Sequence, residues 1–549
     1  MDMYRLREAR SLQEILAEFR WTIPERYNAA YDACDRHASR GGLALVYEDL
    51  LGEQRKCTFS EMKRLSDELA AHLIARGVEA GDRIAIMLPP TPEAAATYLA
   101  TLKIGAIAVP LSLLYGSESL VTRLVNCEPK VIVTTQVQTE KIHAQLRRLA
   151  FIKLLLVVGE STLRVRSLPW GEVEVCTWGD QKGATTRVLS SPKTRADDPA
   201  LLIYTAGTSG EPKGVLLPHR AILSRIVAIQ LAHHPFPSRG DLYWSPVDWA
   251  WVGGLVNSLL VPWILGVPVL TYERGTSFDP VRALEALETH QVRNCFFPPT
   301  ALAYFRRQVR EIRSRYKLDM RSMHAGGESL TPELLEWARK EFGVTVNEVY
   351  GMTEAGIVVG NCSPLMPVKP GSMGTVIPGH EVAILSESGR VATVGGQGLI
   401  AVRRRSPSLF LGYWGDSELT RRLFRRDWFI TGDIATRNGS GYFRFVGRRD
   451  IVVKVSGYRV SPLEVEYLLS KNGAISRCAV VAVPDEERGS VLKAYIQLRK
   501  GYPASPRLAE EIQGYAKRVA GLHQYPREIE FVDRLPSRRF RGPRAKKVV

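Results

Sequence analysis

The sequence predicts an α/β protein with a smaller α+β unit at its C-terminal end. Three changes of pattern along the 549 residues lead to this expectation. Over residues 1–200, helical and strand patterns alternate, which favours a mainly parallel sheet covered by helices. Residues 370–445 contain short strand patterns and many glycines, as in a small β-rich lobe. From residue 450 onward follows a compact unit of about 100 residues, which is an ordinary domain size.

The spacing of apolar residues defines the elements of the alternating region. Leu65, Leu69 and Leu73 share one face of a helix, whereas the apolar run Ile84–Leu88 is too short for a helix and is typical of a buried strand. The expected elements are helices over 61–76 and 92–104 and strands over 84–88, 106–110 and 131–134.

One uncharged stretch, Trp251–Tyr272, is long enough to cross a membrane. Several glycines and prolines, among them Gly266 and Pro268, interrupt it, and such residues do not sustain a long helix. We therefore expect a buried helix followed by a strand over 267–272, and no transmembrane segment.

The C-terminal unit opens with a helix-start signal. Ser461 and Glu464 have the spacing of a capping box, and a proline occupies the first helical position. The expected elements are a helix over 462–469, strands over 478–483 and 491–498, a helix over 508–519 and a strand over 530–532. We expect two domains, an N-terminal domain of residues 1–449 and a C-terminal domain of residues 450–549.

The composition excludes several classes of protein. Hydrophobic residues make up 45% and charged residues 24% of the chain, so it is not disordered, collagen-like or a disulfide scaffold. The seven cysteines lie far apart without a C-x-x-C pair, which argues against a zinc site and for reduced thiols in the cytoplasm. The first residues lack a secretory apolar core and carry acids that transit peptides avoid.

The positive charge needs a separate explanation. The formal net charge is +17, from 74 Lys and Arg against 57 Asp and Glu. Such a charge suits nucleic acid, a membrane surface or anionic small substrates. The basic residues are spread along the chain, apart from a dense run over 538–547, and no zinc-finger spacing or aromatic–basic RNA-binding pattern accompanies them. We therefore expect no nucleic-acid partner.

The sharpest local signal is a buried strand over 200–204 that leads into a loop over 205–214. The loop contains three glycines, three hydroxyl side chains and Lys213. Polyphosphate binding requires such exposed N–H groups, hydroxyl donors and a cation with reach. The loop is not a Walker A motif, because Pro212 stands where that motif has its second glycine. Taken alone, the pattern favours a phosphate site over an ordinary surface loop.

This loop resembles the phosphate loop of the adenylate-forming superfamily, which includes acyl-CoA synthetases, peptide-synthetase adenylation domains and luciferases. The further motifs of that family follow in order at Gly326–Glu328, Tyr350–Glu354, Trp428–Asp433, Gly447–Asp450, Lys454–Arg459 and Tyr525–Arg527. The resemblance covers essentially the whole chain. Residues 24–37 and 245–254 are most similar to the acetyl- and medium-chain acyl-CoA synthetase branch.

The resemblance implies both a fold and a reaction. The expected fold is an N-terminal domain of two α/β lobes with a small β-rich lobe, followed by a small mobile α+β domain. The expected enzyme is an AMP-forming acyl-CoA synthetase, which uses ATP to convert a carboxylic acid to acyl-AMP and pyrophosphate, and then transfers the acyl group to coenzyme A. The first step concentrates negative charge, so catalysis should depend on positioning and fixed positive charge, with Mg²⁺ as cofactor.

The resemblance also assigns the nucleotide site. The expected ATP-binding residues are Thr205, Ala206, Gly207, Thr208, Ser209, Gly210, Lys213, Gly327, Glu328, Tyr350, Thr353, Asp433 and Arg448. Within this site, Tyr350 would stack on adenine and Asp433 would accept the ribose hydroxyls. Glu354 would hold Mg²⁺ through a hard oxygen ligand. The expected catalytic residues are Lys213, Thr353, Glu354 and Arg459.

The second half-reaction is assigned to the C-terminal domain. By resemblance, Asp450 is the hinge about which this domain rotates between the two half-reactions. Rotation would bring Ser456, Gly457 and Tyr458 to the coenzyme A channel. Arg459 and Arg488 would serve phosphates or coenzyme A.

Four residues are expected to line the acyl pocket: Trp251, Val252, Gly253 and Gly351. Acetate-specific members of the family close this pocket with a tryptophan at the position of Gly351. We therefore expect a substrate larger than acetate, namely a medium-chain or short branched fatty acid, with an aromatic acid as the second choice.

The chain departs from the family after Leu535–Pro536, where no lysine stands at the spacing of the last motif. Arg541 and Gly542 occupy that neighbourhood, and arginine does not simply replace a compact lysine charge. Three explanations stay open: an altered reading frame in the tail, a Lys546 that reaches back, or weak adenylation. Two alternative functions also stay open, a ligase with another acyl acceptor and an adenylate-binding homologue impaired in the first half-reaction.

Overall fold

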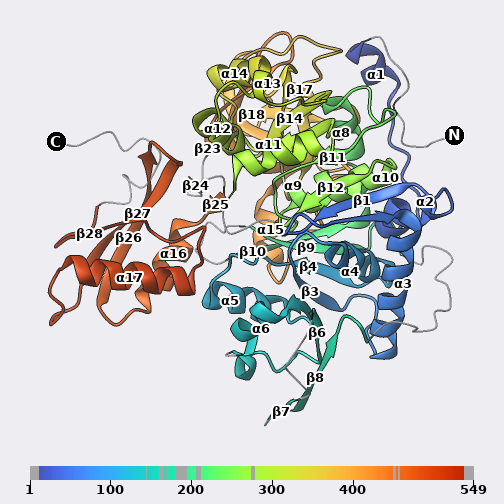
Figure 1. Cartoon of the computed structure of the whole chain (residues 1–549). Helices are drawn as coiled ribbons and strands as arrows, with labels where there is room; N and C mark the ends of the chain where they lie inside the picture. Colours follow the sequence, from blue (N-terminus) through green and yellow to red (C-terminus); the bar gives the residue numbers. More distant parts are fainter. Residues whose placement is uncertain are drawn as a thin grey trace.

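The computed structural model describes residues 6, 11–143, 145–159, 166–168, 171–180, 194–205, 212–273, 278–448, 453–455 and 458–536. These residues form two nine-stranded sheets, a five-stranded sheet and a smaller C-terminal unit with sheets of two and three strands. In Figure 1 the C-terminal unit lies to one side of the body that contains the large sheets. The α/β fold class expected from the sequence is confirmed.

The first large sheet is parallel in its centre. Its order is β17 (Thr375–Val376), β16 (Gly356–Gly360), β15 (Val346–Met352), β14 (Ser322–Gly326), β13 (Asn294–Phe297), β11 (Tyr243–Trp244), β12 (Val269–Tyr272), β1 (Leu43–Glu48) and β2 (Gln54–Thr58). The strands from β15 to β1 pair in parallel, and β2, β16 and β17 pair antiparallel at the two edges. The carboxyl ends of the parallel strands therefore share one edge of the sheet.

The second large sheet has the same character. Its order is β20 (Gly412–Tyr413), β10 (Lys213–Pro218), β9 (Pro199–Thr205), β4 (Ile107–Pro110), β3 (Arg83–Met87), β5 (Val131–Thr135), β6 (Leu154–Val158), β8 (Gly171–Thr177) and β7 (Arg166–Leu168). The strands from β9 to β8 pair in parallel, whereas β7, β10 and β20 pair antiparallel. The strands predicted at 84–88, 106–110 and 131–134 are confirmed to within about a residue as β3, β4 and β5.

Helices cover both sheets. They are α1 (Leu12–Glu18), α2 (Arg36–Ala38), α3 (Phe59–Ala75), α4 (Pro92–Lys103), α5 (Ser117–Cys127), α6 (Gln136–His143), α7 (His219–Leu223), α8 (Ile226–Ala232), α11 (Pro280–Thr289), α12 (Pro299–Gln308), α13 (Ile312–Arg315) and α14 (Pro332–Phe342). The two predicted helices are confirmed as α3 and α4. The start of α3 is set by a capping box between Thr58 and Glu61. Side chains from α3, α4, α8 and both sheets share one large apolar core.

The stretch of membrane length is buried inside the protein. It forms α9 (Val252–Leu255), a π-helical segment (Val256–Leu260) and α10 (Val261–Ile264), and then enters β12. Leu260 and Trp263 are both 0% exposed. Among the described residues, no helix is long and apolar enough to cross a bilayer. The prediction of a buried helix followed by a strand is confirmed.

The β-rich lobe expected over 370–445 is present. Its strands are β18 (Val382–Leu385), β19 (Gln397–Arg403), β22 (Trp428–Arg437), β21 (Phe424–Arg425) and β23 (Phe443–Arg448), with α15 (Ser417–Arg422) beside them. All of these strands pair antiparallel. β22 and β23 carry Asp433 and Arg448 as a directly opposed pair, which becomes important in the site.

The C-terminal unit begins with two short strands that were not predicted, β24 (Val453–Val455) and β25 (Tyr458–Val460). The predicted elements follow in the expected order as α16 (Pro462–Ser470), β26 (Ile475–Asp485), β27 (Gly489–Leu498), α17 (Pro506–Val519) and β28 (Glu528–Phe531). The hydroxyl of Ser461 accepts a hydrogen bond from the backbone N–H of Glu464 at 3.3 Å, as expected for a cap.

The carboxylate of Glu464 differs from the expectation of a reciprocal capping box, because it turns to α5 of the body instead. Its Oε1 lies 3.0 Å from Nη1 of Arg123 and accepts a hydrogen bond from Ser119. Both side chains of this ion pair are about 95% buried, at 4% and 5% exposure. The backbone N–H of Gly116 also donates to the carbonyl of Ala520, at 3.3 Å. The unit is therefore docked on the body through buried polar contacts.

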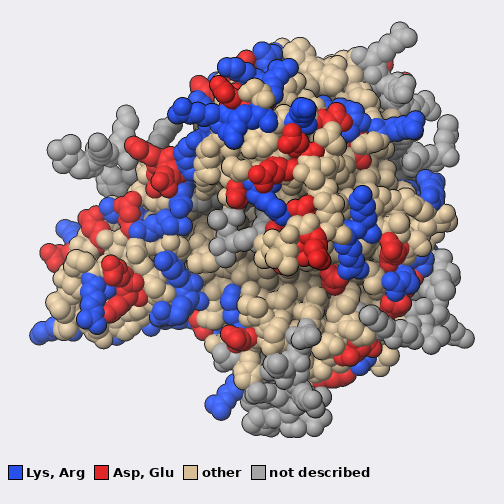
Figure 2. Space-filling model, in the orientation of Figure 1, with Lys and Arg blue, Asp and Glu red and all other residues tan. Residues whose placement is uncertain are grey.

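The distribution of charged side chains and the state of the cysteines are as expected from the sequence. Figure 2 shows Lys and Arg side chains interspersed with Asp and Glu over the visible face, rather than gathered in one stripe. All seven cysteines are free thiols, and six of them are buried.

Candidate active site

A cavity of about 370 Å³ lies where the carboxyl ends of both large sheets meet. From the second sheet it is lined by residues that follow β3 and β4, among them Leu113, and by Thr205, the last residue of β9. From the first sheet it is lined by residues that follow β11, β13, β14 and β15, among them Val247, Thr300 and Thr353. Ligands of open α/β sheets bind at such strand ends.

The turn between β15 and β16 carries Thr353 and Glu354. Thr353 lines the cavity, and Glu354 is 5% exposed beside it. The phenol of Tyr413 donates a hydrogen bond of 2.9 Å to Oε1 of Glu354. The backbone N–H of Phe410 donates to the carbonyl of Glu354, also at 2.9 Å. The other carboxylate oxygen, Oε2, is buried and accepts no hydrogen bond within the described part of the chain.

Thr205 and Lys213 stand at the base of the glycine-rich loop. They are paired across the antiparallel strands β9 and β10, and Thr205 lines the cavity. The Nζ atom of Lys213 lies 5.4 Å from the ring centroid of Tyr413, the same residue that binds Glu354. The lysine and the carboxylate therefore meet at Tyr413. The rest of the expected phosphate loop, Ala206, Gly207, Thr208, Ser209 and Gly210, lies outside the described residues.

Tyr350, Asp433 and Arg448 form a connected group from three strands. The phenol of Tyr350 donates a hydrogen bond of 2.7 Å to Oδ2 of Asp433. Nη1 of Arg448 lies 3.0 Å from Oδ1 of the same carboxylate, which is almost fully buried. The β-rich lobe thus brings its two predicted nucleotide residues against β15 of the first sheet.

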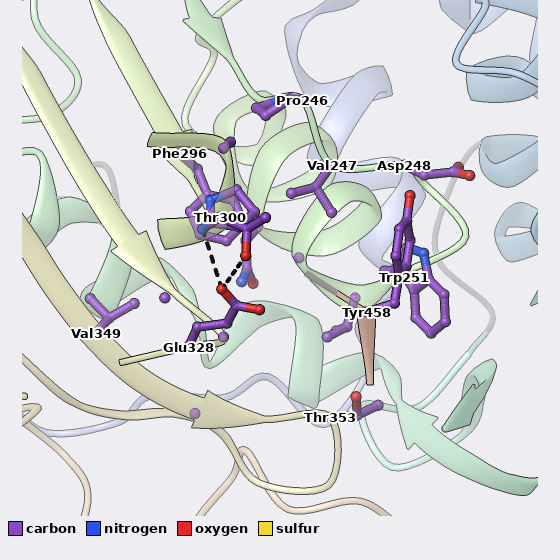
Figure 3. A pocket seen from close by; sticks show the side chains of 18 of the residues that line it. Pro246, Val247, Asp248, Trp251, Phe296, Thr300, Glu328, Val349, Thr353 and Tyr458 are labelled. Carbon is purple, nitrogen blue, oxygen red and sulfur yellow. Dashed lines mark hydrogen bonds between the residues drawn. The ribbon is translucent and has the colours of Figure 1, made fainter. Parts of the chain in front are cut away.

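The two residues after β14 line the cavity from another side. Gly327 has a positive φ of 84°, which favours glycine, and an added Cβ there would meet open space. Oε2 of Glu328 accepts hydrogen bonds from the hydroxyl and the backbone N–H of Thr300, at 2.6 and 3.2 Å. Figure 3 shows this contact across the cavity. Glu328 is thereby held against the first turn of α12.

The four predicted acyl-pocket residues all line the cavity: Trp251, Val252, Gly253 and Gly351. A Cβ added to Gly253 would lie 3.1 Å from the ring of Phe296 and 3.8 Å from a methyl of Val247. The space beside Gly253 is therefore bounded by apolar side chains. Figure 3 shows Phe296 and Val247 in this wall.

The structure corrects the use of Gly351 to predict the size of the acyl group. A Cβ added to Gly351 would lie 2.2 Å from the carbonyl oxygen of Gly356 and 2.8 Å from the Cα of Ile357. The β15–β16 hairpin thus excludes a side chain at position 351, so this glycine does not measure the room for an acyl group. Gly253 is the better indicator of the room for an acyl group, because a Cβ at this position would meet only the side chains of Phe296 and Val247.

Among the polar wall residues that sequence reasoning missed are two that are almost fully buried. Arg225, at the start of α8, and Asn257, in the π-helical segment, both line the cavity. Burial lowers the pKa of Arg225 to about 10, against the opposing field of Glu354. Arg225 is the only charged residue in the mostly apolar stretch 221–232, and this was the available signal.

The docked C-terminal unit contributes Tyr458 to the cavity. Its ring centroid lies 6.1 Å from that of Trp251 and 5.2 Å from that of His523, and Figure 3 shows Trp251 and Tyr458 side by side. Arg488 lies apart from the cavity, in the turn between β26 and β27, where its N–H donates to Asp485. Ser456, Gly457, Asp450 and the side chain of Arg459 lie outside the described residues.

Comparison with family models gives the class of the protein. The model of the AMP-binding enzyme matches residues 32–414, and the model of the AMP-binding enzyme C-terminal domain matches residues 464–540. The chain therefore belongs to the AMP-binding enzyme family, the adenylate-forming enzymes.

Relatives narrow the class. Acetyl-coenzyme A synthetase of Bacillus subtilis is 35% identical over 526 residues, which cover 94% of this chain and 88% of that protein. Mitochondrial acyl-coenzyme A synthetase ACSM2 of Rattus norvegicus is 30% identical over 528 residues, covering 94% and 90%. The crystal structure of the Brucella canis acyl-CoA synthetase superposes with a TM-score of 0.71 at 29% identity and 96% coverage of both chains. The chain is an AMP-forming acid–CoA ligase, with a carboxylic acid, ATP and coenzyme A as substrates.

Proposed function

We propose that this ligase activates a carboxylic acid larger than acetate, with medium-chain or short branched fatty acids as its first class of substrate. The support is the cavity of about 370 Å³, whose wall beside Gly253 is formed by Phe296 and Val247. An apolar wall favours an alkyl chain by about 0.8 kcal/mol for each buried CH₂.

The first half-reaction would take place at the turn that carries Thr353. An oxygen of the substrate carboxylate attacks the α-phosphorus of ATP, and pyrophosphate leaves. Thr353 and Lys213 would bind the phosphates, together with the loop 206–210. Gly327, Glu328 and Tyr350 would hold the adenine side, and Asp433 with Arg448 the ribose. The proposal draws support from Thr353, Gly327 and Glu328, which line the cavity together.

Mg²⁺ fits this arrangement. Oε2 of Glu354 is a buried oxygen that accepts no hydrogen bond from any described residue, and hard cations prefer such a ligand. Among the described residues, no group of three or more His, Cys, Asp or Glu side chains could hold a metal ion by itself. Mg²⁺ usually binds one or two carboxylates together with substrate phosphates. The ion would supply charge neutralisation on the phosphates.

The second half-reaction would use the C-terminal domain, residues 450–549. The thiol of coenzyme A attacks the acyl carbonyl carbon, and AMP leaves. Tyr458 lies in the cavity wall of this structure, so we assign the docked arrangement to thioester formation. Ser456, Gly457, Arg459 and Arg488 would bind coenzyme A or its phosphates, and rotation about Asp450 would provide the alternate arrangement for adenylation.

The altered tail concerns the first half-reaction. The family model for the C-terminal domain ends at residue 540, before Arg541 and Gly542. These residues and Lys546 lie outside the described part of the chain. We propose that adenylation proceeds without a lysine at the motif spacing. The seven free thiols support a reducing compartment, and we place the enzyme in the cytoplasm.

One observation carries the proposal: an apolar cavity and the Thr353–Glu354 turn meet at the same strand ends. The test is acid-dependent ATP–pyrophosphate exchange over straight-chain acids from acetate to decanoate, with isobutyrate, isovalerate and benzoate added. We expect kcat/KM to peak between butanoate and octanoate. Exchange that is fastest with acetate would overturn the size assignment. Absence of exchange with every acid, with thioester still formed from synthetic acyl-adenylate and coenzyme A, would show that the first half-reaction is lost.

A further inference from the structure

One polar side chain in the cavity wall has no role in the chemistry described above. Arg225 is only 2% exposed, yet its side chain lines the cavity together with Gly253 and Phe296. Arg225 is the residue just before α8, and its side chain reaches Asn257 in the π-helical segment. A cation in this position faces the space that the acyl chain would fill.

The hydrogen bonds of Arg225 are few and long. Nη1 donates to Oδ1 of Asn257 at 3.4 Å, and Nη2 donates to the carbonyl of Thr353 at 3.4 Å. Good N–H···O bonds are shorter, about 2.9–3.0 Å. The Nε–H group has no hydrogen-bond partner in the described structure. Because a guanidinium carries five N–H donors, most of its capacity is unused.

The charge of Arg225 is only partly balanced. Glu354 attracts it through space, and burial, which acts in the opposite direction, lowers the pKa to about 10. The group therefore stays protonated at neutral pH. A buried cation whose N–H donors are only partly paired is unfavourable, so a substrate oxygen that accepts hydrogen bonds from these donors would stabilise it.

The acidic groups of the cavity already have donors of their own. Glu328 accepts from Thr300 at 2.6 Å, and Asp248 accepts from the N–H of Ala250 at 3.0 Å. These acids therefore do not accept from Arg225, whose Nε–H group has no acceptor among the described residues. A plain alkyl chain would exclude water from Arg225 and leave its Nε–H group unpaired, whereas a chain with an oxygen at the right depth would accept a hydrogen bond from it.

We propose that Arg225, assisted by Asn257, selects acids that carry a second, distal hydrogen-bond-accepting oxygen, such as a hydroxyl, keto or carboxylate oxygen. This inference rests on the proposed function and narrows the substrate class of the same site. The reacting carboxylate would lie at the hydroxyl of Thr353. The second oxygen group would lie at Nε and Nη1 of Arg225, whose Nη2 contacts the carbonyl of Thr353 instead.

The test compares acids of equal length with and without the second oxygen. Wild-type enzyme is assayed by pyrophosphate exchange with hexanoate, 6-hydroxyhexanoate, 5-oxohexanoate and adipate, and with the matching four- and eight-carbon sets. We expect at least one oxygenated acid to exceed its plain counterpart about tenfold or more in kcat/KM, because a site built to donate hydrogen bonds rejects analogues that lack the acceptor.

Variants assign the preference to Arg225. Arg225→Met keeps the volume and removes the donors, and we expect the ratio of oxygenated to plain acid to fall about tenfold, close to one. Gly253→Ala is the matched control: it narrows the same cavity for both acids and should leave the ratio unchanged. Thermal unfolding confirms that the variants are folded. If Arg225→Met is unstable, Arg225→Lys is used, and the ratio is expected to fall for 6-hydroxyhexanoate more than for adipate.

Three results would overturn the inference. The first is equal kcat/KM for oxygenated and plain acids in the wild type at all three lengths. The second is an equal loss for both kinds of acid in Arg225→Met, which would assign Arg225 to the reacting carboxylate or to the fold. The third is a ratio changed as much by Gly253→Ala as by Arg225→Met. Absence of exchange with every acid contradicts the proposed function itself, whereas exchange with plain acids alone contradicts only the role of Arg225.

Discussion

At the scale of single residues, the carboxylate of Glu354 is the centre of the site. One of its oxygens is held by Tyr413 at 2.9 Å, and the other is buried without a donor among the described residues. This orientation leaves one oxygen without a donor, and this oxygen would hold the Mg²⁺ that we propose as cofactor.

Glu354→Gln should therefore impair adenylation strongly. The amide keeps the shape but loses the negative charge, so we expect pyrophosphate exchange to fall about 100-fold and half-saturation by Mg²⁺ to rise. Exchange rates as a function of Mg²⁺ concentration provide the measurement. Glu336→Gln, on the exposed face of α14, is the control and should behave as wild type. An unchanged Mg²⁺ dependence in Glu354→Gln would contradict the proposal that Glu354 binds this ion.

Gly253 tests the length of the acyl pocket. In Gly253→Val, the new Cβ would start 3.1 Å from the ring of Phe296 and the branched methyls would fill the cavity beside it. We expect kcat/KM for octanoate to fall about tenfold or more, while that for propionate changes less than about threefold. The measurement is exchange over the acid series. Equal losses at all chain lengths would contradict the assignment of this wall to the acyl chain.

The site residues differ in how far sequence reasoning could find them. Thr353, Asp433 and Gly327 stand next to strand ends in short motifs, so their positions followed from local pattern and resemblance. Arg225 and Tyr413 do not, because their importance comes from burial and from partners far away in the chain. Tyr413 reaches Glu354 across 59 residues of sequence, and no local pattern encodes such a contact.

At the scale of elements, the contact between α5 and α16 holds the C-terminal unit in place. The ion pair of Arg123 with Glu464 joins residues 341 apart and is almost fully buried. A capping box alone predicts a local role for Glu464, and the structure gives it a partner on the other domain instead. The start of α16 was predictable from Ser461, whereas the interface was not.

Glu464→Gln should separate the two half-reactions. Removing one charge leaves Arg123 buried without its partner, which costs about 3–5 kcal/mol when the unit is docked. We expect thioester formation from preformed acyl-adenylate and coenzyme A to slow at least about tenfold, while pyrophosphate exchange changes less than about threefold. Each half-reaction is followed separately by mass spectrometry or exchange.

The matched control for this interface is Glu118→Gln. Glu118 of α5 lies 3.5 Å from Lys471, the residue after α16, and 2.9 Å from Arg148. These side chains are more exposed than Arg123 and Glu464, and such surface pairs contribute about 0–1 kcal/mol. Glu118→Gln should leave both half-reactions unchanged. Equal slowing of both half-reactions in Glu464→Gln would indicate a general loss of stability and contradict a specific role in docking.

At the scale of the whole molecule, the fold class was predictable because helical and strand periods alternate along the chain. The arrangement of two sheets around one cavity was not predictable from periodicity, since it depends on which strands pair.

The burial of five histidines was not predictable from periodicity either, because they are scattered over the sequence. Burial lowers the pKa of His219 and His380 to about 4 and that of His324 and His523 to about 3, and it lowers the pKa of His233 as well.

These histidines predict acid sensitivity. Each is neutral in the folded state, whereas in the unfolded chain it binds a proton below about pH 6.5. Above pH 6.5 these histidines are neutral in both states and do not change the free energy of unfolding. As the pH falls from 6.5 toward 4, proton binding by the unfolded chain lowers the free energy of unfolding by up to about 1.4 kcal/mol per pH unit for each histidine. Scanning calorimetry should show a Tm that is nearly flat from pH 7 to 8 and falls steeply below about pH 6. His143→Gln, at an exposed position, should not alter the profile. A Tm at pH 5 equal to that at pH 7 would contradict this.

The central claim is that the Thr353–Glu354 turn and the adjoining cavity activate a carboxylic acid through its adenylate. Transfer of ¹⁸O tests this most directly. The enzyme is incubated with ATP, Mg²⁺, coenzyme A and an acid labelled with ¹⁸O in its carboxylate, and the products are examined by mass spectrometry. We predict acyl-CoA together with AMP that carries one ¹⁸O, because the carboxylate oxygen remains on the α-phosphate. Formation of acyl-CoA with label in inorganic phosphate, or with unlabelled AMP, would contradict the account.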